Sequence, residues 1–251
     1  MAGFALFLCF QLLQPMKLIH ALPVVLVILA SCQGSPQEEK APEGVETEET
    51  TGATQWVGLY ADTLPCADCP GILTQLDLRA DSTYVMRDRY LERDSIPYGT
   101  IGQWTVAGDM LTLKTADVPM RWKLEGDRLV RRDADGGPVE TTLPNSIGRV
   151  ANFGSLPMRL SGAYVYYADS HSFTPCGSKF VIPVAMDEAG TGGAGLELER
   201  AYSNRIKTPP DPLFVEVTAS LRTGPAMEGD STEEYLYIER LERVKEMQKC
   251  P

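Results

Sequence analysis

The feature that most constrains the fold of this chain is a period-two alternation of apolar and polar residues through residues 56–143. The alternation comes in short runs, and turn residues separate the runs at intervals of roughly eight to twelve positions. Because helical periodicity is lacking here, the pattern predicts an antiparallel meander that closes into a small β-barrel or half-barrel. The predicted strands are Trp56–Tyr60, Ile72–Leu78, Thr83–Tyr90, Gly102–Val106, Leu111–Thr115, Met120–Leu124 and Arg128–Arg132.

The remaining chain predicts a second domain. We interpret residues 144–157 as a linker and residues 158–251 as a domain with several short strands and a single helix, which is typical of an OB-like barrel. The fold class is therefore mainly β. The predicted elements are strands Ser161–Tyr167, Phe180–Met186, Leu213–Leu221 and Tyr235–Val244, and a helix Leu196–Asn204 that follows a glycine-rich loop at Gly190–Gly195.

The N-terminal segment has the parts of a secretory signal peptide. Lys17 precedes the apolar run Leu18–Ala30, and a small residue and Cys32 follow it. The run is shorter than the roughly 20 residues that span a bilayer. The sequence Leu-Ala-Ser-Cys that ends at Cys32 resembles the lipobox of bacterial lipoproteins. We therefore expect translation to start at Met16, residues 1–31 to be removed and lipid to be attached to Cys32.

Residues 32–55 are acidic, polar and free of aromatic side chains. Such a segment cannot bury enough apolar surface to fold, so we interpret it as a disordered tether between the lipid and the folded part. By analogy with other lipoproteins, Gln33 after Cys32 favours the outer membrane, with the protein facing the periplasm or displayed on the surface. The net charge of −11 argues against nucleic acid and against anionic lipid surfaces as partners.

Four cysteines remain beyond the signal segment: Cys66, Cys69, Cys176 and Cys250. In an oxidising compartment, four cysteines suggest two disulfides, and three pairings are possible. The close spacing of Cys66 and Cys69 favours a local bridge, which leaves Cys176 to pair with Cys250.

Three interpretations of Cys66 and Cys69 compete. The first is a structural disulfide that pins a loop between two strands. The second is a copper site, because paired thiolates suit Cu(I), with Met86 or Met110 as further donors. The third is a redox-active pair, which is weakened because a strand follows Cys69 rather than the helix that lowers the pKa of a reactive thiol.

His171 is the only histidine after the signal segment, which argues against enzymes that need several histidines or a full catalytic triad. We interpret it as a solvated loop residue beside Asp169. Tyr164 and Tyr166 share one strand face and are interpreted as core residues. The sequence has no phosphate-binding loop and no dinucleotide fingerprint, so it predicts a protein that is not an enzyme.

Motifs in both halves carry a family resemblance. The first is Thr-Leu-Pro-Cys-Ala-Asp-Cys-Pro-Gly-Ile at Thr63–Ile72, and the second runs from Met158 to Asp169 and on to Phe173-Thr174-x-Cys176. Together they resemble the NlpE family of outer-membrane lipoproteins. The resemblance implies a lipocalin-like N-terminal barrel followed by an OB-like barrel. It also implies roles in copper homeostasis and in envelope-stress signalling through the Cpx sensor kinase.

Two other functional hypotheses stay open. One is a lipoprotein whose barrel binds copper or a small apolar ligand without any signalling role. The other is a thiol–disulfide enzyme. The glycine-rich loop Gly190–Gly195 and the proline-rich loop Thr208–Pro212 depart from the family pattern, so the resemblance assigns no partner surface there.

Overall fold

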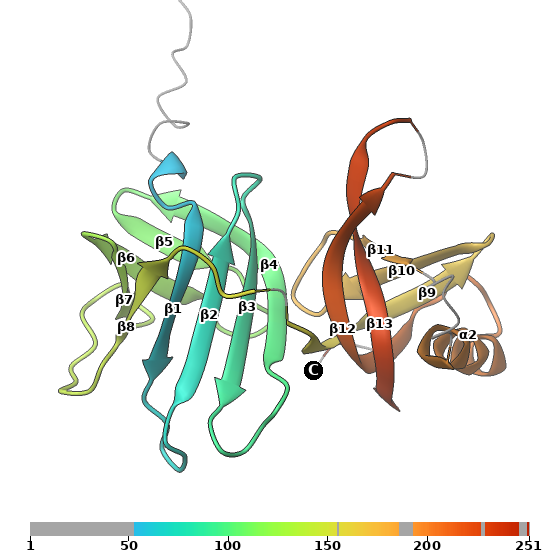
Figure 1. The fold of residues 1–251 in the computed structure, drawn as a ribbon, viewed down its shortest axis with the longest axis horizontal. Helices are drawn as coiled ribbons and strands as arrows, with labels where there is room; N and C mark the ends of the chain where they lie inside the picture. The colour runs from blue at the N-terminus through green and yellow to red at the C-terminus, as the bar shows by residue number, and fades with distance from the viewer. Residues whose placement is uncertain (1–52, 155, 186–192, 227–228, 246–249, 251) are drawn as a thin grey trace, which may run out of the picture. The chain divides into compact units, whose positions relative to one another are not determined.

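The computed structural model describes residues 53–154, 156–185, 193–226, 229–245 and 250 (Figure 1). The predicted signal segment, Cys32 and the tether up to residue 52 lie outside the described residues. Within the described ranges, no helix is long and apolar enough to span a bilayer.

Eight antiparallel strands form the first barrel (Figure 1). Each strand pairs with the next one along the chain, and the ring closes where β8 pairs with β1. The predicted meander that closes into a barrel is therefore confirmed. The strands are β1 (Gly58–Leu64), β2 (Ile72–Leu78), β3 (Thr83–Tyr90), β4 (Tyr98–Ala107), β5 (Met110–Leu113), β6 (Met120–Glu125), β7 (Arg128–Arg132) and β8 (Ser146–Val150).

The alternation places one face of each strand inside this barrel. Tyr60 lies opposite Leu76, and Leu76 lies opposite Met86, so the three side chains share the inner face. Large side chains fill the interior, as is usual for small eight-stranded barrels. The other buried members of this core are Trp56, Leu78, Tyr84, Trp104, Leu111, Leu113, Trp122, Leu129 and Ile147.

Two boundaries predicted for this domain are wrong. The segment 144–157 is not wholly a linker, because β8 pairs with both β1 and β7 and its Ile147 is fully buried. Residues 53–55, predicted as part of the tether, form a turn that leads into the barrel. Trp56 N donates to Ala53 O, and Arg149 Nη2 donates to Gln55 O at 2.7 Å.

Five strands and one helix form the second barrel. The strands close in the order β9, β10, β11, β13, β12 and back to β9, and only the β11–β13 pairing is parallel. This arrangement confirms an OB-like barrel with one helix. The elements are β9 (Met158–Tyr167), β10 (Ser170–Pro175), β11 (Ile182–Ala185), α2 (Gly193–Arg205), β12 (Leu213–Pro225) and β13 (Thr232–Val244).

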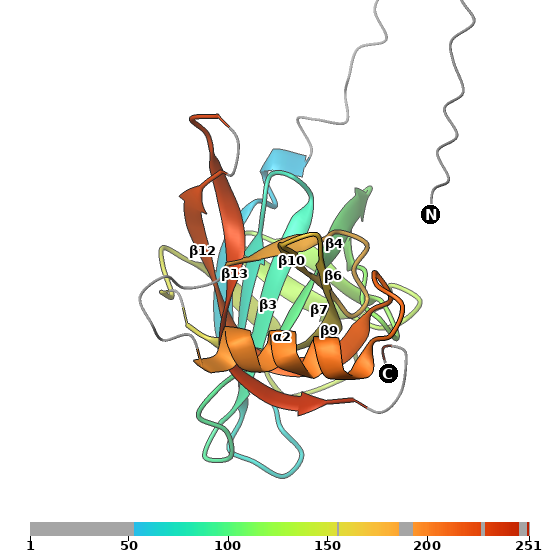
Figure 2. The same cartoon turned by 90° about the vertical axis from the view of Figure 1, so that its right-hand side faces the viewer.

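The helix α2 lies against β9 and β13 (Figure 2). Its Leu198, Ala201 and Tyr202 are buried in the core of the second barrel. Two details of the sequence prediction are wrong here. The strand β10 was not predicted, and Gly193–Gly195, assigned to a loop, form the first turn of α2.

Side chains of the two barrels also contact one another. Arg79 of the first barrel makes a two-pronged ion pair with Glu234 of β13, at 2.7 and 3.0 Å. Arg159 of β9 contacts Asp94 at 3.2 Å. Val85 and Ile101, on the outer face of the first barrel, pack against the core of the second. Loosening either barrel therefore disturbs part of the other.

Candidate functional site

The loop between β1 and β2 carries Cys66 and Cys69, which the structure joins by a disulfide with a Cα–Cα distance of 5.3 Å. Gly71 ends the loop where space is tight, because a Cβ at this position would collide with the Thr63 methyl group. The carbonyl of Gly71 accepts a hydrogen bond from Leu91 N. The bridge thus sits in a loop that is anchored at its base to the strands on either side.

The charges around this loop disfavour a reactive thiolate. Asp68 Oδ1 lies 3.6 Å from Cys66 Sγ, which in the disulfide carries no hydrogen to donate. Were the bridge reduced, this carboxylate would oppose a negative charge on the sulfur. Arg93 Nη1 lies 3.0 Å from the same carboxylate oxygen and offsets part of that effect. The residues that follow Cys69 lead into β2, so no helix N-terminus stabilises a thiolate here.

The donors proposed for copper are not gathered at this loop. Met86 is buried in the core of the first barrel, and the Met110 side chain packs beside Gly136 on the β7–β8 connection. Among the described residues, no three Cys, His, Asp or Glu side chains are grouped as a metal site. The oxidised loop therefore does not fit Cu(I), which needs free thiolates or thioethers.

The structure joins Cys176 to Cys250, with a Cα–Cα distance of 5.5 Å and a sequence separation of 74 residues. Cys176 directly follows β10, and its N–H donates to the Ser161 carbonyl of β9 at 2.9 Å. The closed loop contains β11, α2, β12 and β13. This bond ties the residues after β13 back to the β9–β10 hairpin, so it spans most of the second barrel.

His171 is not a solvated loop residue, which corrects the sequence interpretation. It lies on β10 opposite Tyr166, and the two rings stack with centroids 4.5 Å apart. Its Nδ1 is 2.6 Å from the Tyr164 hydroxyl. Burial lowers the pKa of His171, while Glu199 and Asp169 partly oppose this shift. The imidazole is therefore mainly neutral at pH 7, and its Nδ1 shares a hydrogen bond with the Tyr164 hydroxyl.

A tight hairpin produces this cluster. Ala168 and Asp169 have positive φ angles of 50° and 59°, and they form the two-residue loop between β9 and β10. Such a turn returns the chain so that His171 faces Tyr166. The Ala-Asp pair was the only available signal, and alanine at a positive φ is uncommon, so the hairpin was missed. Tyr164 is fully buried and edge-on to Tyr202 of α2, as expected for a core residue.

Comparison with known proteins matches both barrels. Residues 60–142 match the model of the NlpE N-terminal domain, and residues 154–251 match that of the NlpE C-terminal OB domain. Lipoprotein NlpE of Escherichia coli (strain K12) is 30% identical over 192 residues, which cover 74% of this chain and 75% of the relative.

Two solved structures are also similar in sequence. The crystal structure of the Cpx pathway activator NlpE from Escherichia coli is 29% identical, covers 77% of this chain and 97% of its own, and gives a TM-score of 0.32. The crystal structure of a putative lipoprotein from Shewanella oneidensis is 26% identical to this chain. The match covers 39% of this chain and 91% of the Shewanella chain, with a TM-score of 0.35. The two domain models together cover both barrels, and the chain therefore belongs to the NlpE family.

Proposed function

We propose that this protein is a lipid-anchored, non-enzymatic component of envelope-stress signalling. The family membership supports this role, because the relative from Escherichia coli is described as the activator of the Cpx pathway. The main structural support for this proposal is the Cys176–Cys250 disulfide, which spans the second barrel. A protein whose fold depends on one long-range disulfide reports whether the envelope is oxidising.

The size of this dependence follows from loop length. In the chain-entropy model, closing a loop of about 70 residues stabilises the folded state by about 4 kcal/mol. This is a large share of the free energy of unfolding of a typical domain, which is about 5–15 kcal/mol. Failure to form the bond would leave the second barrel loosened, and the proposed signal is this loosened state acting on an envelope sensor kinase.

A stress-reporter assay tests the proposal. Cys176→Ser and Cys250→Ser should each raise the output of a Cpx-type reporter, and Cys66→Ser with Cys69→Ser is the matched control. An unchanged reporter in the first two variants, at equal protein levels, would mean that the long bridge is not the sensing element. Peptide mapping without reductant checks both pairings in the same protein.

The anchor is the second part of the proposal. We infer that the mature chain begins at an acylated Cys32 in the outer membrane. Cys32→Ala should give unprocessed or soluble protein. A free Cys32 thiol in the mature protein, detected by mass spectrometry, would contradict acylation, and fractionation with the inner membrane would contradict the location.

A role in copper homeostasis is proposed only for the reduced form of the first loop. Its support is that Cys66 and Cys69 lie within bonding distance of each other and would present two thiolates after reduction. Cu(I) should then bind the reduced protein and not the oxidised one. Titration of both forms, with the Cys66→Ser, Cys69→Ser variant as control, measures the difference, and equal binding by all three would place copper elsewhere.

A further inference from the structure

The turn that follows β10 carries Cys176 and lies against the first barrel. Ser178 N donates to the Pro175 carbonyl at 3.0 Å and closes this turn. Gly177 has a φ of 81°, and a Cβ at this position would lie 2.5 Å from Ala116 N of the loop between β5 and β6. The two backbones therefore meet at the residue next to Cys176, where a larger side chain would not fit.

The loop between β5 and β6, residues 114–119, is held by its own hydrogen bonds. At its start, the Lys114 carbonyl accepts a hydrogen bond from the Tyr84 hydroxyl at 2.8 Å. Across the loop, Thr115 Oγ1 donates to the Val118 carbonyl at 2.9 Å. The Val118 side chain is 65% exposed, so it adds little apolar packing. Hydrogen bonds therefore keep this loop, which we call the β5–β6 loop, against the Cys176 turn.

A cavity of about 210 Å³ lies between the β5–β6 loop and the second barrel. Cys176 is among its lining residues, together with Thr115 and Ala116 of the loop and Ser161 of β9, whereas Cys250 is not. The volume is enough for several water molecules of about 30 Å³ each. It lies below the about 300 Å³ at which ligand pockets usually begin. A small thiol can therefore reach Cys176 through this cavity, but a folded protein cannot.

The cover over Cys176 does not lift freely, because the two barrels are joined beside the cavity. Arg159 of β9 lines the cavity, and its N–H donates to the Pro97 carbonyl of the first barrel at 2.8 Å. Ile101 of β4 also lines it, is only 2% exposed and packs against the core of the second barrel. Opening the cavity would break this hydrogen bond and expose this side chain to water, and both changes cost free energy.

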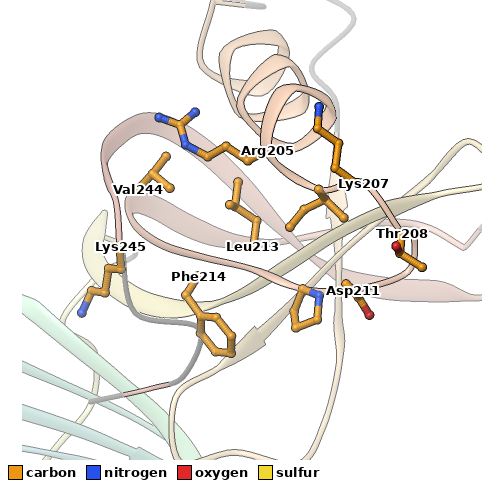
Figure 3. A pocket seen from close by; sticks show the side chains of 10 residues that line it. Arg205, Lys207, Thr208, Asp211, Leu213, Phe214, Val244 and Lys245 are labelled. Carbon is orange, nitrogen blue, oxygen red and sulfur yellow. The ribbon is translucent and has the colours of Figure 1, made fainter.

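The other cysteine of the bond is reached from the end of β13. Lys245 is the last described residue before Cys250, and its N–H donates to the Phe214 carbonyl at 2.8 Å. Figure 3 shows these two residues beside each other at one edge of a groove in the second barrel. The chain therefore arrives at Cys250 from β13 and not through the contact with Ala116.

We propose that the β5–β6 loop shields the Cys176 sulfur, so that a protein thiol exchanges with this disulfide at the Cys250 sulfur. The partner is, by chemical class, a dithiol oxidoreductase of the envelope. One of its thiolates attacks Cys250 Sγ, the Cys176–Cys250 bond breaks, and its electron pair and then a proton go to Cys176 Sγ. The second thiolate of the partner then attacks the partner's own sulfur in the mixed disulfide. This step releases Cys250 as a thiol and leaves the partner oxidised to a disulfide, so two electrons pass to this protein.

This inference deepens the proposed function, because it names the sulfur at which the long disulfide is reduced or, by the reverse steps, formed. Its meaning in the cell rests on that function, whereas its test is chemical. An unresponsive stress reporter would count against the sensing function and leave the exchange site unaffected. Attack at Cys176 would overturn the exchange site and leave the sensing function unaffected.

Trapping of the mixed disulfide tests the proposal on the full mature chain carrying Cys32→Ala. The probe is a thioredoxin whose second active-site cysteine is replaced by serine, so that the reaction stops at the mixed disulfide. After acid quenching and alkylation, peptide mapping identifies the cysteine that is bonded to the probe. The product with the probe on Cys250 and an alkylated Cys176 should exceed the opposite product roughly tenfold, because opening a loop held by one or two net hydrogen bonds costs about that factor.

A small thiol controls for size. Because the cavity admits 2-mercaptoethanol, this reagent should form mixed disulfides with Cys176 and with Cys250 in similar amounts. If 2-mercaptoethanol showed the same preference for Cys250 as the protein probe, the preference would come from the chemistry of the two sulfurs. The shielding proposal would then be wrong.

A loop variant tests the shield directly. Thr115→Ala removes the hydrogen bond across the β5–β6 loop and should raise the share of probe on Cys176 roughly fivefold. Thr141→Ala is the matched control, because Thr141 Oγ1 accepts a hydrogen bond from Leu143 N at 3.0 Å in the connection between β7 and β8 of the same barrel. It should leave that share unchanged, and thermal unfolding curves check that both variants are folded. Equal effects of the two variants, or a probe found mainly on Cys176 before any loop substitution, would overturn the proposal.

Discussion

The two barrels of this chain are stabilised in different ways. In the first, every strand but β1 pairs with the strand directly before it, and the disulfide joins cysteines only three positions apart. In the second, β11 pairs with β13 across an intervening helix and strand, and the disulfide spans 74 positions. Both barrels have a buried apolar core, and the first also closes through a pairing that is distant in sequence, β1 with β8. What distinguishes the second barrel is the long cross-link that it adds to its core.

This difference bears on which barrel can sense a change in the envelope. A cross-link stabilises a fold in proportion to the entropy that it removes from the unfolded chain, and that entropy grows with loop length. Reduction should thus act on the second barrel much more than on the first. The contacts between Arg79 and Glu234 and around Ile101 would transmit part of that change.

The largest effect we predict is loss of the long disulfide. Cys176→Ser with Cys250→Ser should lower the free energy of unfolding of the second barrel by about 4 kcal/mol, whereas Cys66→Ser with Cys69→Ser should cost about 2 kcal/mol. Limited proteolysis and denaturant unfolding of both variants measure this. If the two barrels of the Cys176→Ser, Cys250→Ser variant resisted the protease equally, the second barrel would not depend more on its disulfide than the first, and the proposed sensing role would lose its basis.

The next effect concerns β8, which closes the first barrel. Ile147→Ala should destabilise that barrel by about 3 kcal/mol, because Ile147 is fully buried in the core. Leu143→Ala is the matched control from the preceding connection; Leu143 is 59% exposed, and its loss should cost less than about 0.5 kcal/mol. Similar unfolding midpoints for the two variants would mean that β8 does not contribute to closure.

The strands of the first barrel could be predicted because large apolar residues recur at alternate positions on their inner faces, as at Leu76 and Leu78 of β2. β8 could not, because its sequence Ser-Ile-Gly-Arg-Val contains only one fully buried residue, Ile147. A strand that short is defined by its partners β1 and β7, and those pairings are tertiary contacts that local periodicity does not contain.

The environment of His171 could not be predicted from the sequence for a similar reason. A single histidine near an aspartate suggests a solvated loop, and nothing in the sequence shows that the turn at Ala168 and Asp169 is only two residues long. The cysteine spacing was more informative, because it suggested a local bridge and left one long one.

A smaller effect is predicted at Asp88 in the first barrel. Burial raises the pKa of this carboxyl, against the opposing effects of the Thr74 hydroxyl, which donates to it at 2.6 Å, and of Arg131. Because the folded pKa is raised, the first barrel should gain stability as the pH falls toward the unfolded value of 3.8. The Asp88→Asn variant should be more stable than the unmutated protein at pH 7, and its stability should not rise in this way as the pH falls. Unfolding at several pH values measures both effects. A parent and variant with parallel pH profiles would contradict the burial argument.

The second barrel should respond to acid in the opposite direction through His171. The groups that face this histidine are Tyr164 and Tyr166 of β9, Asp169 of the turn and Glu199 of α2. Burial lowers the folded pKa below 6.5, so the unfolded chain takes up the proton first. The part of the second barrel's stability that depends on a neutral His171 is therefore complete above pH 6.5. It is lost as the pH falls from 6.5 toward the pKa of His171 in the folded protein. His171→Gln keeps a hydrogen-bonding partner for the Tyr164 hydroxyl but removes the titrating group. The second barrel of this variant should therefore lack the pH-dependent loss of stability when unfolding is followed between pH 7 and pH 5. The first barrel has no histidine and serves as the internal control; a second barrel that loses stability equally in parent and variant would show that His171 stays uncoupled from folding.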